Sequence, residues 1–281
     1  MILGIITVAA TLSAMAAAFS EGFVGIGWLF AAVLSFFGVF LGLVLVAFLV
    51  LWISAKAVDM EKPQETDSKF YRFLANQTIS TGIPLLGIRI KTKGLKKVPK
   101  DGRFLLVCNH INDLDPAVIL NSFPKRQLAF ISKRENSKKF IVGPLMHKIL
   151  CQPINRENDR EALKTILNCI RLLKEDKACI GVFPEGYVSL DGLLRPLKPG
   201  VFKIAQKAQV PVVVCTLKGT PQILKNARRF RPTRVDFHVV EVLPAQALQE
   251  VTTVQIAHQV YDLMAKDLGE DMVYREETEN T

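Results

Sequence analysis

The sequence predicts an α/β domain with a mixed, largely parallel sheet flanked by helices, preceded by an N-terminal transmembrane helical hairpin. Three observations carry this prediction. Residues 1–55 are apolar and hold a single charged side chain, Glu21. All 36 Lys and Arg residues, and all but one of the 26 acidic residues, lie beyond residue 55. In that second part, short Val- and Ile-rich runs alternate with helix-like segments, which is typical of a sheet covered on both faces.

Two apolar runs define the expected hairpin. Residues 2–19 form an uncharged run of 18 residues, which is long enough to cross a bilayer. The run from 23 to 55 is longer than one straight crossing needs. We therefore expect helices near 2–19 and 29–53, with a glycine-rich turn between them. Lys56 and Lys62 follow directly, and the positive-inside rule then places the body of the protein in the cytosol.

Two other interpretations of residues 1–55 stay open at this point. A secretory signal peptide would begin with basic residues, and no Lys or Arg precedes the first apolar run. A buried hairpin of a soluble protein is the second, although runs of 18 or more uncharged residues favour a membrane. We expect an integral membrane protein with a cytosolic domain, and the short, compact layout favours a bacterial cytoplasmic membrane.

The remaining elements follow in order. Residues 56–67 are polar and indicate a linker, and residues 68–86 predict an amphipathic helix lying against the membrane or the domain. The chain then divides into a hairpin (1–55), a linker with an interfacial segment (56–86) and a cytosolic domain (87–281). Strands are expected at 87–93, 103–108, 127–131, 151–154, 178–183, 211–217 and 234–243. Helices are expected at 116–122, 136–149, 158–175, 199–208 and 254–268.

Two boundaries carry local signals. Asp115 followed by Pro116 is a good N-cap and first residue for a helix. The turn at 181–186 contains Pro184, which cannot donate a ladder hydrogen bond, so a strand should end there. That places Glu185 at a strand's end, where open α/β sheets bind their ligands.

The positive charge limits the partners. The chain has a net charge of +10, which could meet nucleic acid, anionic lipid or a phosphorylated substrate. It shows no basic stripe interleaved with aromatic residues and no helix-turn-helix pattern, so we expect no nucleic-acid partner. Beside a membrane anchor, the anionic headgroups of the lipid bilayer are the nearest polyanion.

Two basic clusters could serve either as solvated faces or as anion-binding surfaces. The first consists of Lys225, Arg228, Arg229, Arg231 and Arg234, and the second of Lys133, Arg134, Lys138 and Lys139. The first cluster could bind lipid headgroups. The second could do the same, or could bind a phosphate-rich donor such as coenzyme A.

A histidine and an aspartate at the end of a hydrophobic run are the strongest candidates for chemistry. His110 lies five residues before Asp115. A histidine can accept a proton near neutral pH, and a carboxylate can orient it and favour the imidazolium. Positions five apart do not share a helix face, so the pair meets only if the backbone turns at Asn112 and Asp113. The outward ring nitrogen would then be a general base for a substrate hydroxyl. In the other interpretation, Asp115 only caps a helix and His110 is an ordinary loop residue.

Other chemistries lack the residues that they need. No Gly-x-Ser-x-Gly elbow supplies a serine nucleophile. The five cysteines form no Cys-x-x-Cys pair and indicate reduced packing residues, and Cys108 continues a strand-like run, which makes it a weak nucleophile candidate. A site made of His110, Asp115 and Glu185 has no second histidine, so we expect no metal.

Four segments follow one another in a characteristic order. Each is short, but four ordered blocks are far more specific than one. They are Asn109–Asp115 (Asn-His-x-x-x-x-Asp); Lys133, Gly143-Pro144 and Pro153-Ile154-Asn155-Arg156; Phe183-Pro184-Glu185-Gly186; and Val210-Pro211-Val212-Val213-Val214. In these blocks, over about residues 85–245, the chain resembles the glycerophospholipid acyltransferase family, which includes bacterial lysophosphatidate acyltransferases.

The resemblance implies an enzyme of phospholipid biosynthesis. It would transfer a fatty acyl group from a thioester, acyl-CoA or acyl-ACP, to the free hydroxyl of 1-acyl-glycerol-3-phosphate, giving phosphatidic acid. His110 would be the general base and Asp115 its orienting partner, and the hydroxyl would attack directly without an acyl-enzyme. The family uses no metal or redox cofactor. The residues expected to bind substrate are Asn109, Lys133, Arg156, Glu185, Gly186 and Lys198.

One departure from the family bears on the acceptor. The third block usually continues Thr-Arg-Ser, whereas this chain has Tyr187-Val188-Ser189. If that arginine grips phosphate, Lys198, Arg195 or Lys203 must substitute. Three alternatives therefore remain: an acyltransferase or transacylase for another lysophospholipid, a lipid hydrolase in which the base activates water, and a non-catalytic lipid-binding module.

Overall fold

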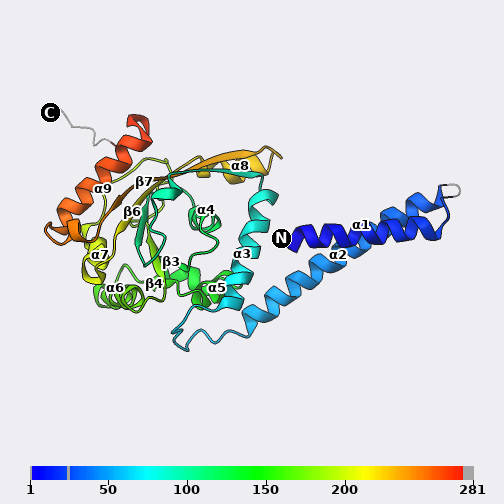
Figure 1. Cartoon of the computed structure of the whole chain (residues 1–281), viewed down its shortest axis with the longest axis horizontal. Helices are drawn as coiled ribbons and strands as arrows, with labels where there is room; N and C mark the ends of the chain where they lie inside the picture. The colour runs from blue at the N-terminus through cyan, green and yellow to red at the C-terminus, as the bar shows by residue number, and fades with distance from the viewer. Residues whose placement is uncertain (1, 24–25, 275–281) are drawn as a thin grey trace.

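The computed structural model describes residues 2–23 and 26–274 and has a seven-stranded sheet at its centre (Figure 1). The strand order is β1-β7-β6-β2-β5-β3-β4. The strands are β1 (Ile88–Lys93), β2 (Leu105–Cys108), β3 (Leu128–Lys133), β4 (Gln152–Ile154), β5 (Cys179–Val182), β6 (Val212–Lys218) and β7 (Thr233–Leu243).

Strand directions divide the sheet into two parts. β6, β2, β5, β3 and β4 are parallel to one another, whereas β7 runs antiparallel to β6 and pairs in parallel with β1. This confirms the predicted mixed, largely parallel sheet. The five parallel strands bring their carboxyl ends to one edge, so the loops after β2 and β5 are neighbours there.

The helices cover a fully apolar central layer. β2 and β5 are buried along their whole length, which requires cover on both faces. The helices after the hairpin are α3 (Lys69–Leu85), α4 (Asp115–Ser122), α5 (Val142–Lys148), α6 (Asp159–Lys174), α7 (Lys203–Ala208), α8 (Ile223–Ala227) and α9 (Thr253–Leu268). α6 packs on β5 and α9 on β6 and β7, while α3 contacts α4, α5 and β1.

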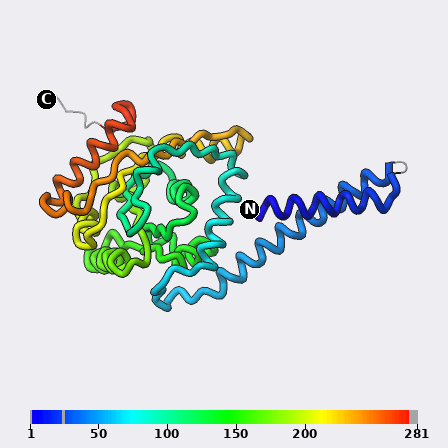
Figure 2. Tube along the Cα trace, viewed as in Figure 1, coloured from blue at the N-terminus to red at the C-terminus, as the bar shows by residue number. Residues whose placement is uncertain are grey.

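The N-terminal segment forms the predicted pair of helices, α1 (Ile2–Ser20) and α2 (Gly27–Lys56). They pack side by side and project away from the α/β domain (Figures 1 and 2). Both are long and apolar enough to cross a membrane. Large side chains such as Leu34 are mostly exposed, 73% in that case, so the hairpin is not the buried core of the domain.

α3 lies against the domain through a buried arginine. Arg72 donates from Nη1 to the carbonyl of Leu128 (2.8 Å) and from Nη2 to that of Ile149 (3.1 Å). Its charge is balanced by Asp67, with 2.5 Å between Nη2 and Oδ1. The helix was expected to lie against the membrane or against the domain, and its inner face packs on the domain. The three-part division of the chain stays a prediction.

Two local expectations were wrong, and one helix was missed. The helix expected at 136–149 is a 3₁₀ turn over Arg134–Lys138 followed by α5, because Gly143 packs so closely on the Ser137 carbonyl that the chain must turn there. α8 was not predicted. Asp115 is the first residue of α4, and the residue before it, Leu114, makes no side-chain cap. The carboxylate of Asp115 is used elsewhere, as described next.

Candidate active site

The loop after β2 brings His110 and Asp115 together. Nδ1 of His110 lies 2.9 Å from Oδ2 of Asp115. The same carboxylate oxygen accepts the backbone N–H groups of Ile111 (2.7 Å) and Asn112 (2.8 Å). The aspartate therefore closes the turn and holds the imidazole at once, which leaves Nε2 as the outward nitrogen. Asp115 is fully buried, whereas the side chain of His110 is 13% exposed.

Aromatic stacking fixes the plane of the His110 imidazole ring. The His110 ring lies 3.9 Å from the Phe183 ring at an angle of 14°. Phe183 stacks in turn on Phe130, at 5.5 Å. Gly181 makes this possible, since a Cβ there would lie 2.5 Å from the Phe130 ring. The ring of the candidate base is thus fixed by one hydrogen bond and one stacked face.

Glu185, predicted to bind substrate, is turned toward the protein backbone. It is 1% exposed, and its carboxylate accepts the N–H of His110 at 2.7 Å and of Arg195 at 3.1 Å. The carbonyl of His110 accepts the N–H of Ser189 at 2.7 Å. The backbone of the histidine is therefore clamped on both sides by the loop that follows β5, and Glu185 positions it rather than reaching into solvent.

Burial raises the pKa of Glu185 from 4.5 to about 7, against the lowering effect of the hydrogen bonds from His110 and Arg195. Because the folded protein binds this proton more readily than the unfolded chain, Glu185 contributes stability that is fully present below pH 4.5 and is lost as the pH rises through about 7. We expect the free energy of unfolding to fall by up to about 3 kcal/mol between pH 5 and pH 8 from this group.

The matched variant Glu185→Gln cannot titrate, so its thermal unfolding temperature in detergent should lose this part of the pH dependence. Between pH 5 and pH 8 the unfolding temperature of wild type should fall relative to that of the variant, because only the wild-type carboxyl ionises. Equal pH profiles for the two proteins would refute the assignment.

Asn109 also differs from its expected role. The side chain is fully buried, its Nδ2 donates to the carbonyl of Leu217 (3.0 Å), and its Oδ1 accepts the Leu217 N–H (2.7 Å). Both polar atoms are used in tying the end of β2 to the end of β6. Asn109 therefore positions the loop and does not present its amide to a substrate.

Gly186 and Lys198, two of the expected substrate-binding residues, lie next to each other. Gly186 has φ of +86°, a conformation that favours glycine. A Cβ on it would lie 2.8 Å from Cε and 2.9 Å from Nζ of Lys198, so the lysine lies across the turn. The Lys198 N–H donates to the Pro184 carbonyl at 2.8 Å, which fixes its backbone beside the Glu185 turn.

Lys133 and Arg156 lie farther along the same edge. Lys133 ends β3 and Arg156 follows β4 by two residues, and both are exposed. With strands about 4.8 Å apart, β3 is about 10 Å and β4 about 14 Å from β2. Lys133 pairs with Glu135, with 3.8 Å between Nζ and Oε2. The two cations therefore lie along the same edge, two and three strands away from β2.

The thiol nearest to His110 is not a competing nucleophile. Cys108 is fully buried, and burial together with the nearby thiol of Cys215 raises the pKa of Cys108 well above its ordinary value. The five cysteines are all free and buried, as predicted. Within the described residues, no group of three His, Cys, Asp or Glu side chains is placed to hold a metal ion.

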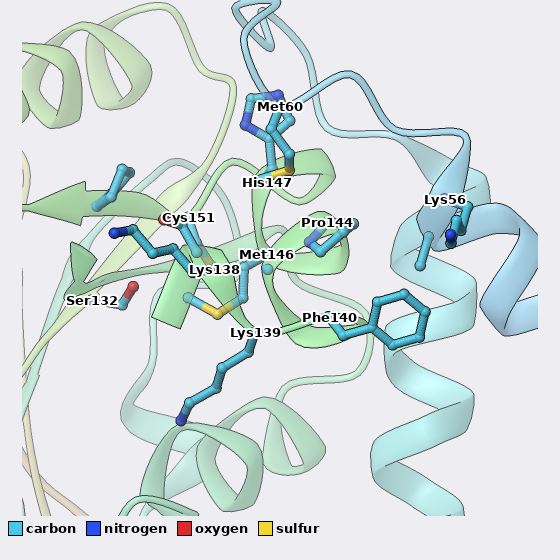
Figure 3. A pocket seen from close by; sticks show the side chains of 14 residues that line it. Lys56, Met60, Ser132, Lys138, Lys139, Phe140, Pro144, Met146, His147 and Cys151 are labelled. Carbon is cyan, nitrogen blue, oxygen red and sulfur yellow. The ribbon is translucent and has the colours of Figure 1, made fainter. Parts of the chain in front are cut away.

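A pocket of about 570 Å³ opens between α5 and the end of α2 (Figure 3). Phe140, Pro144 and Met146 give it an apolar wall, and Lys138 and Lys139 extend from one side. One lining residue, Cys151, accepts the Phe130 N–H at 3.3 Å with its sulfur, and the ring of Phe130 stacks on Phe183, the ring that contacts His110. The pocket was not predicted, since its walls come from segments far apart in sequence.

Fold and site together define an α/β domain that presents one oriented histidine base at the carboxyl edge of its parallel strands, beside cations and an apolar pocket. Such a site suits proton abstraction from an amphiphilic, anionic substrate. Residues 89–218, the stretch that holds the His110 loop, match the family model described as Acyltransferase.

Relatives by sequence agree with this match. The chain is 35% identical over 158 residues to a chloroplastic 1-acyl-sn-glycerol-3-phosphate acyltransferase of Brassica napus, covering 56% of this chain and 44% of that protein. It is 30% identical over 173 residues to a probable 1-acyl-sn-glycerol-3-phosphate acyltransferase of Mycoplasma genitalium, covering 60% and 62%. The aligned regions thus span less than two thirds of either relative.

The fold has a solved counterpart. The crystal structure of the 1-acyl-sn-glycerophosphate acyltransferase PlsC from Thermotoga maritima matches with a TM-score of 0.61 and 22% identity, over 95% of this chain and 96% of that one. The match extends through the N-terminal helices, so the whole layout of hairpin and α/β domain is shared.

Proposed function

We propose that this protein is a membrane-bound O-acyltransferase that moves a fatty acyl group from a thioester to the free hydroxyl of 1-acyl-glycerol-3-phosphate, giving phosphatidic acid. The observation that carries the proposal is the 2.9 Å contact between Nδ1 of His110 and Oδ2 of buried Asp115 at the carboxyl edge of the sheet. The names of both sequence relatives support this choice of acceptor.

The proposed chemistry is one direct displacement. Nε2 of His110 takes the proton of the acceptor hydroxyl as its oxygen attacks the thioester carbonyl carbon. The tetrahedral intermediate collapses, the C–S bond breaks, and the thiolate takes the proton back from the imidazolium. Asp115 stabilises the imidazolium between these steps. Holding both substrates beside the base supplies much of the rate, up to roughly 7–11 kcal/mol in the best intramolecular cases.

The cations along the edge are the proposed phosphate site. Arg195, one candidate for the missing arginine's role, has its guanidinium engaged by Asp191 at 2.5 Å and stacked over Tyr274. Among the described residues, Lys198 has no carboxylate within ion-pair distance and lies across Gly186. We therefore assign the phosphate contact to Lys198, with Lys133 and Arg156 extending the same positive edge.

Removing this cation should weaken acceptor binding selectively. Lys198→Ala should raise the KM for lysophosphatidate about tenfold, since a hydrogen bond to a charged group contributes roughly 1.5 kcal/mol or more. The kcat should change little, because the base is untouched. Lys207→Ala, an exposed lysine on α7, is the control in initial-rate assays. An unchanged KM in Lys198→Ala would remove it from the phosphate site.

The pocket beside α5 is the proposed place of the donor. Its apolar wall suits an acyl chain, and Lys138 and Lys139 suit the phosphates of coenzyme A or the acidic surface of acyl carrier protein. The proposed reaction needs no metal or redox cofactor, because the thioester already activates the carbonyl. The hairpin would hold the domain at the bilayer, on the cytosolic side of a bacterial membrane, where an insoluble diacyl product can be released.

A second acceptor has one observation in its favour. Tyr187 stands before Val188 where the family has Thr-Arg, so the guanidinium that would grip a terminal phosphate is missing. A panel of lysolipids offered with acyl-CoA and with acyl-ACP separates the cases. We expect lysophosphatidate to be acylated fastest. Turnover of another lysophospholipid without turnover of lysophosphatidate would replace the first proposal with the second.

A further inference from the structure

An exposed phenylalanine stands at the tip of the loop after α8. Phe230 is 98% exposed and has φ of +51°, a conformation that a bulky side chain rarely adopts. The loop is nonetheless well built: the carbonyl of Asn226 accepts the N–H groups of Arg229 and Arg231, each at 2.9 Å, and its amide donates to Oγ1 of Thr233 at 3.0 Å. The protein therefore holds an apolar ring in water by a specific turn.

The ring is surrounded by basic side chains. Lys225, Arg228, Arg229 and Arg231 are all exposed, and within the described residues none has a carboxylate in ion-pair distance. Arg234 pairs with Asp236 at 3.2 Å and is the exception. No acidic residue occurs between Lys218 and Arg234. An exposed aromatic ring surrounded by unpaired basic side chains suits the surface of an anionic bilayer. The basic side chains would meet the headgroups, and the ring would meet the apolar layer beneath them.

The loop lies on the side of the domain from which the hairpin projects (Figures 1 and 2). α3 links the two structures. The start of α1 touches it, with the Ile2 N–H donating to Oε1 of Gln77 at 3.3 Å. Just beyond the C-terminal end of α3, the carbonyl of Gly87 accepts the N–H of Thr233 at 2.9 Å, which attaches the α8 loop there.

The outer face of α3 continues the same surface. Phe70, Phe73 and Leu85 are exposed by 52%, 41% and 70%, and α3 runs from near the end of α2 to the α8 loop (Figure 1). Its inner face is held by Arg72. A plane crossed by the hairpin at its base would therefore meet this face of α3 and then the α8 loop.

We propose that residues 224–234 are a second membrane contact, in which Phe230 enters the interface of an anionic bilayer while Lys225, Arg228, Arg229 and Arg231 bind lipid phosphates. This inference rests on the proposed insertion of the hairpin. The hairpin and the α8 loop would then both contact the membrane. Together they would fix the rotation of the domain about the hairpin and hold the His110 edge in one orientation to the lipid. Polybasic segments next to a membrane anchor act in this way.

The test places a fluorescent label at the loop tip of the full chain. Phe230→Cys is labelled with an environment-sensitive nitrobenzoxadiazole, which is selective because the native cysteines are buried. Val254→Cys on α9, on the opposite side of the domain, is the matched control. Each labelled protein is reconstituted in vesicles with 30% phosphatidylglycerol or with phosphatidylcholine alone, and flotation with the vesicles reports hairpin insertion separately.

We expect the label at 230 to shift to the blue and to be quenched by spin-labelled lipid in phosphatidylglycerol vesicles, and the label at 254 to do neither. Replacing Arg228, Arg229 and Arg231 by Gln should lower the docked-to-undocked ratio about fivefold per residue, or about 100-fold in all. A floating protein whose label at 230 behaves like that at 254 would overturn the inference. So would equal docking on phosphatidylcholine, or protection in detergent that grows with protein concentration and indicates a second copy. Failure to float would instead refute hairpin insertion.

Discussion

His110→Ala should lower the initial rate of phosphatidate formation by at least ~100-fold, the low end of what general-base catalysis contributes. The expected loss is large because the site offers no second base at that place: Cys108 is buried with a raised pKa, and Glu185 faces the backbone. The rate would be measured with saturating thioester donor and lysophosphatidate in mixed micelles.

The matched control is His258→Ala, an exposed histidine on α9. It should keep wild-type activity. Vesicle association should be unchanged in both variants, because the hairpin is intact. An active His110→Ala protein would remove the histidine from the chemistry and, with it, the proposed mechanism.

Substitution of Asp115 should have the second-largest effect and can separate charge from orientation. Asp115→Ala removes the acceptor of Nδ1 and leaves the N–H groups of Ile111 and Asn112 without their partner. We expect a loss of ~100-fold or more in rate, within the range for general-base catalysis, and a lower unfolding temperature, since two buried donors lose their acceptor.

Asp115→Asn keeps an oxygen for the two backbone donors but removes the negative charge that stabilises the imidazolium. Its unfolding temperature should stay near that of wild type, while the rate falls by about 10- to 100-fold, the worth of one charged hydrogen bond. Near-normal rates in both variants would show that Asp115 only closes the turn and has no part in the chemistry.

The meeting of His110 with Asp115 could be anticipated but not decided from the sequence. Spacing allowed either a helix cap or a curled-back carboxylate. In the structure Asp115 is the first residue of α4 but does not cap it, because its carboxylate turns back to the loop and holds His110. The strand ends were predictable because Val- and Ile-rich runs stop at turn formers, and parallel strands bring those ends to one edge.

The residues that hold His110 in place could not be predicted in the same way. Phe130 and Phe183 are indistinguishable from ordinary core residues in the sequence, and only the pairing of β3 with β5 stacks them under the imidazole. Gly181 gave a weak signal, as a glycine inside an apolar strand often marks a close approach. Asn109 and Glu185 were recognised by motif, but their contacts with backbone groups depend on which strands lie side by side.

The central claim is that the oriented base deprotonates an acceptor hydroxyl and that the acyl group passes to it directly. The most direct test follows a radiolabelled acyl group from the thioester, with wild-type protein, in the presence and absence of lysophosphatidate. We expect label in phosphatidate only when the acceptor is present, with little free fatty acid and none on the protein. Release of labelled fatty acid at the same rate without acceptor would show a hydrolase, and stable label on the protein would show an acyl-enzyme; either result would contradict the account.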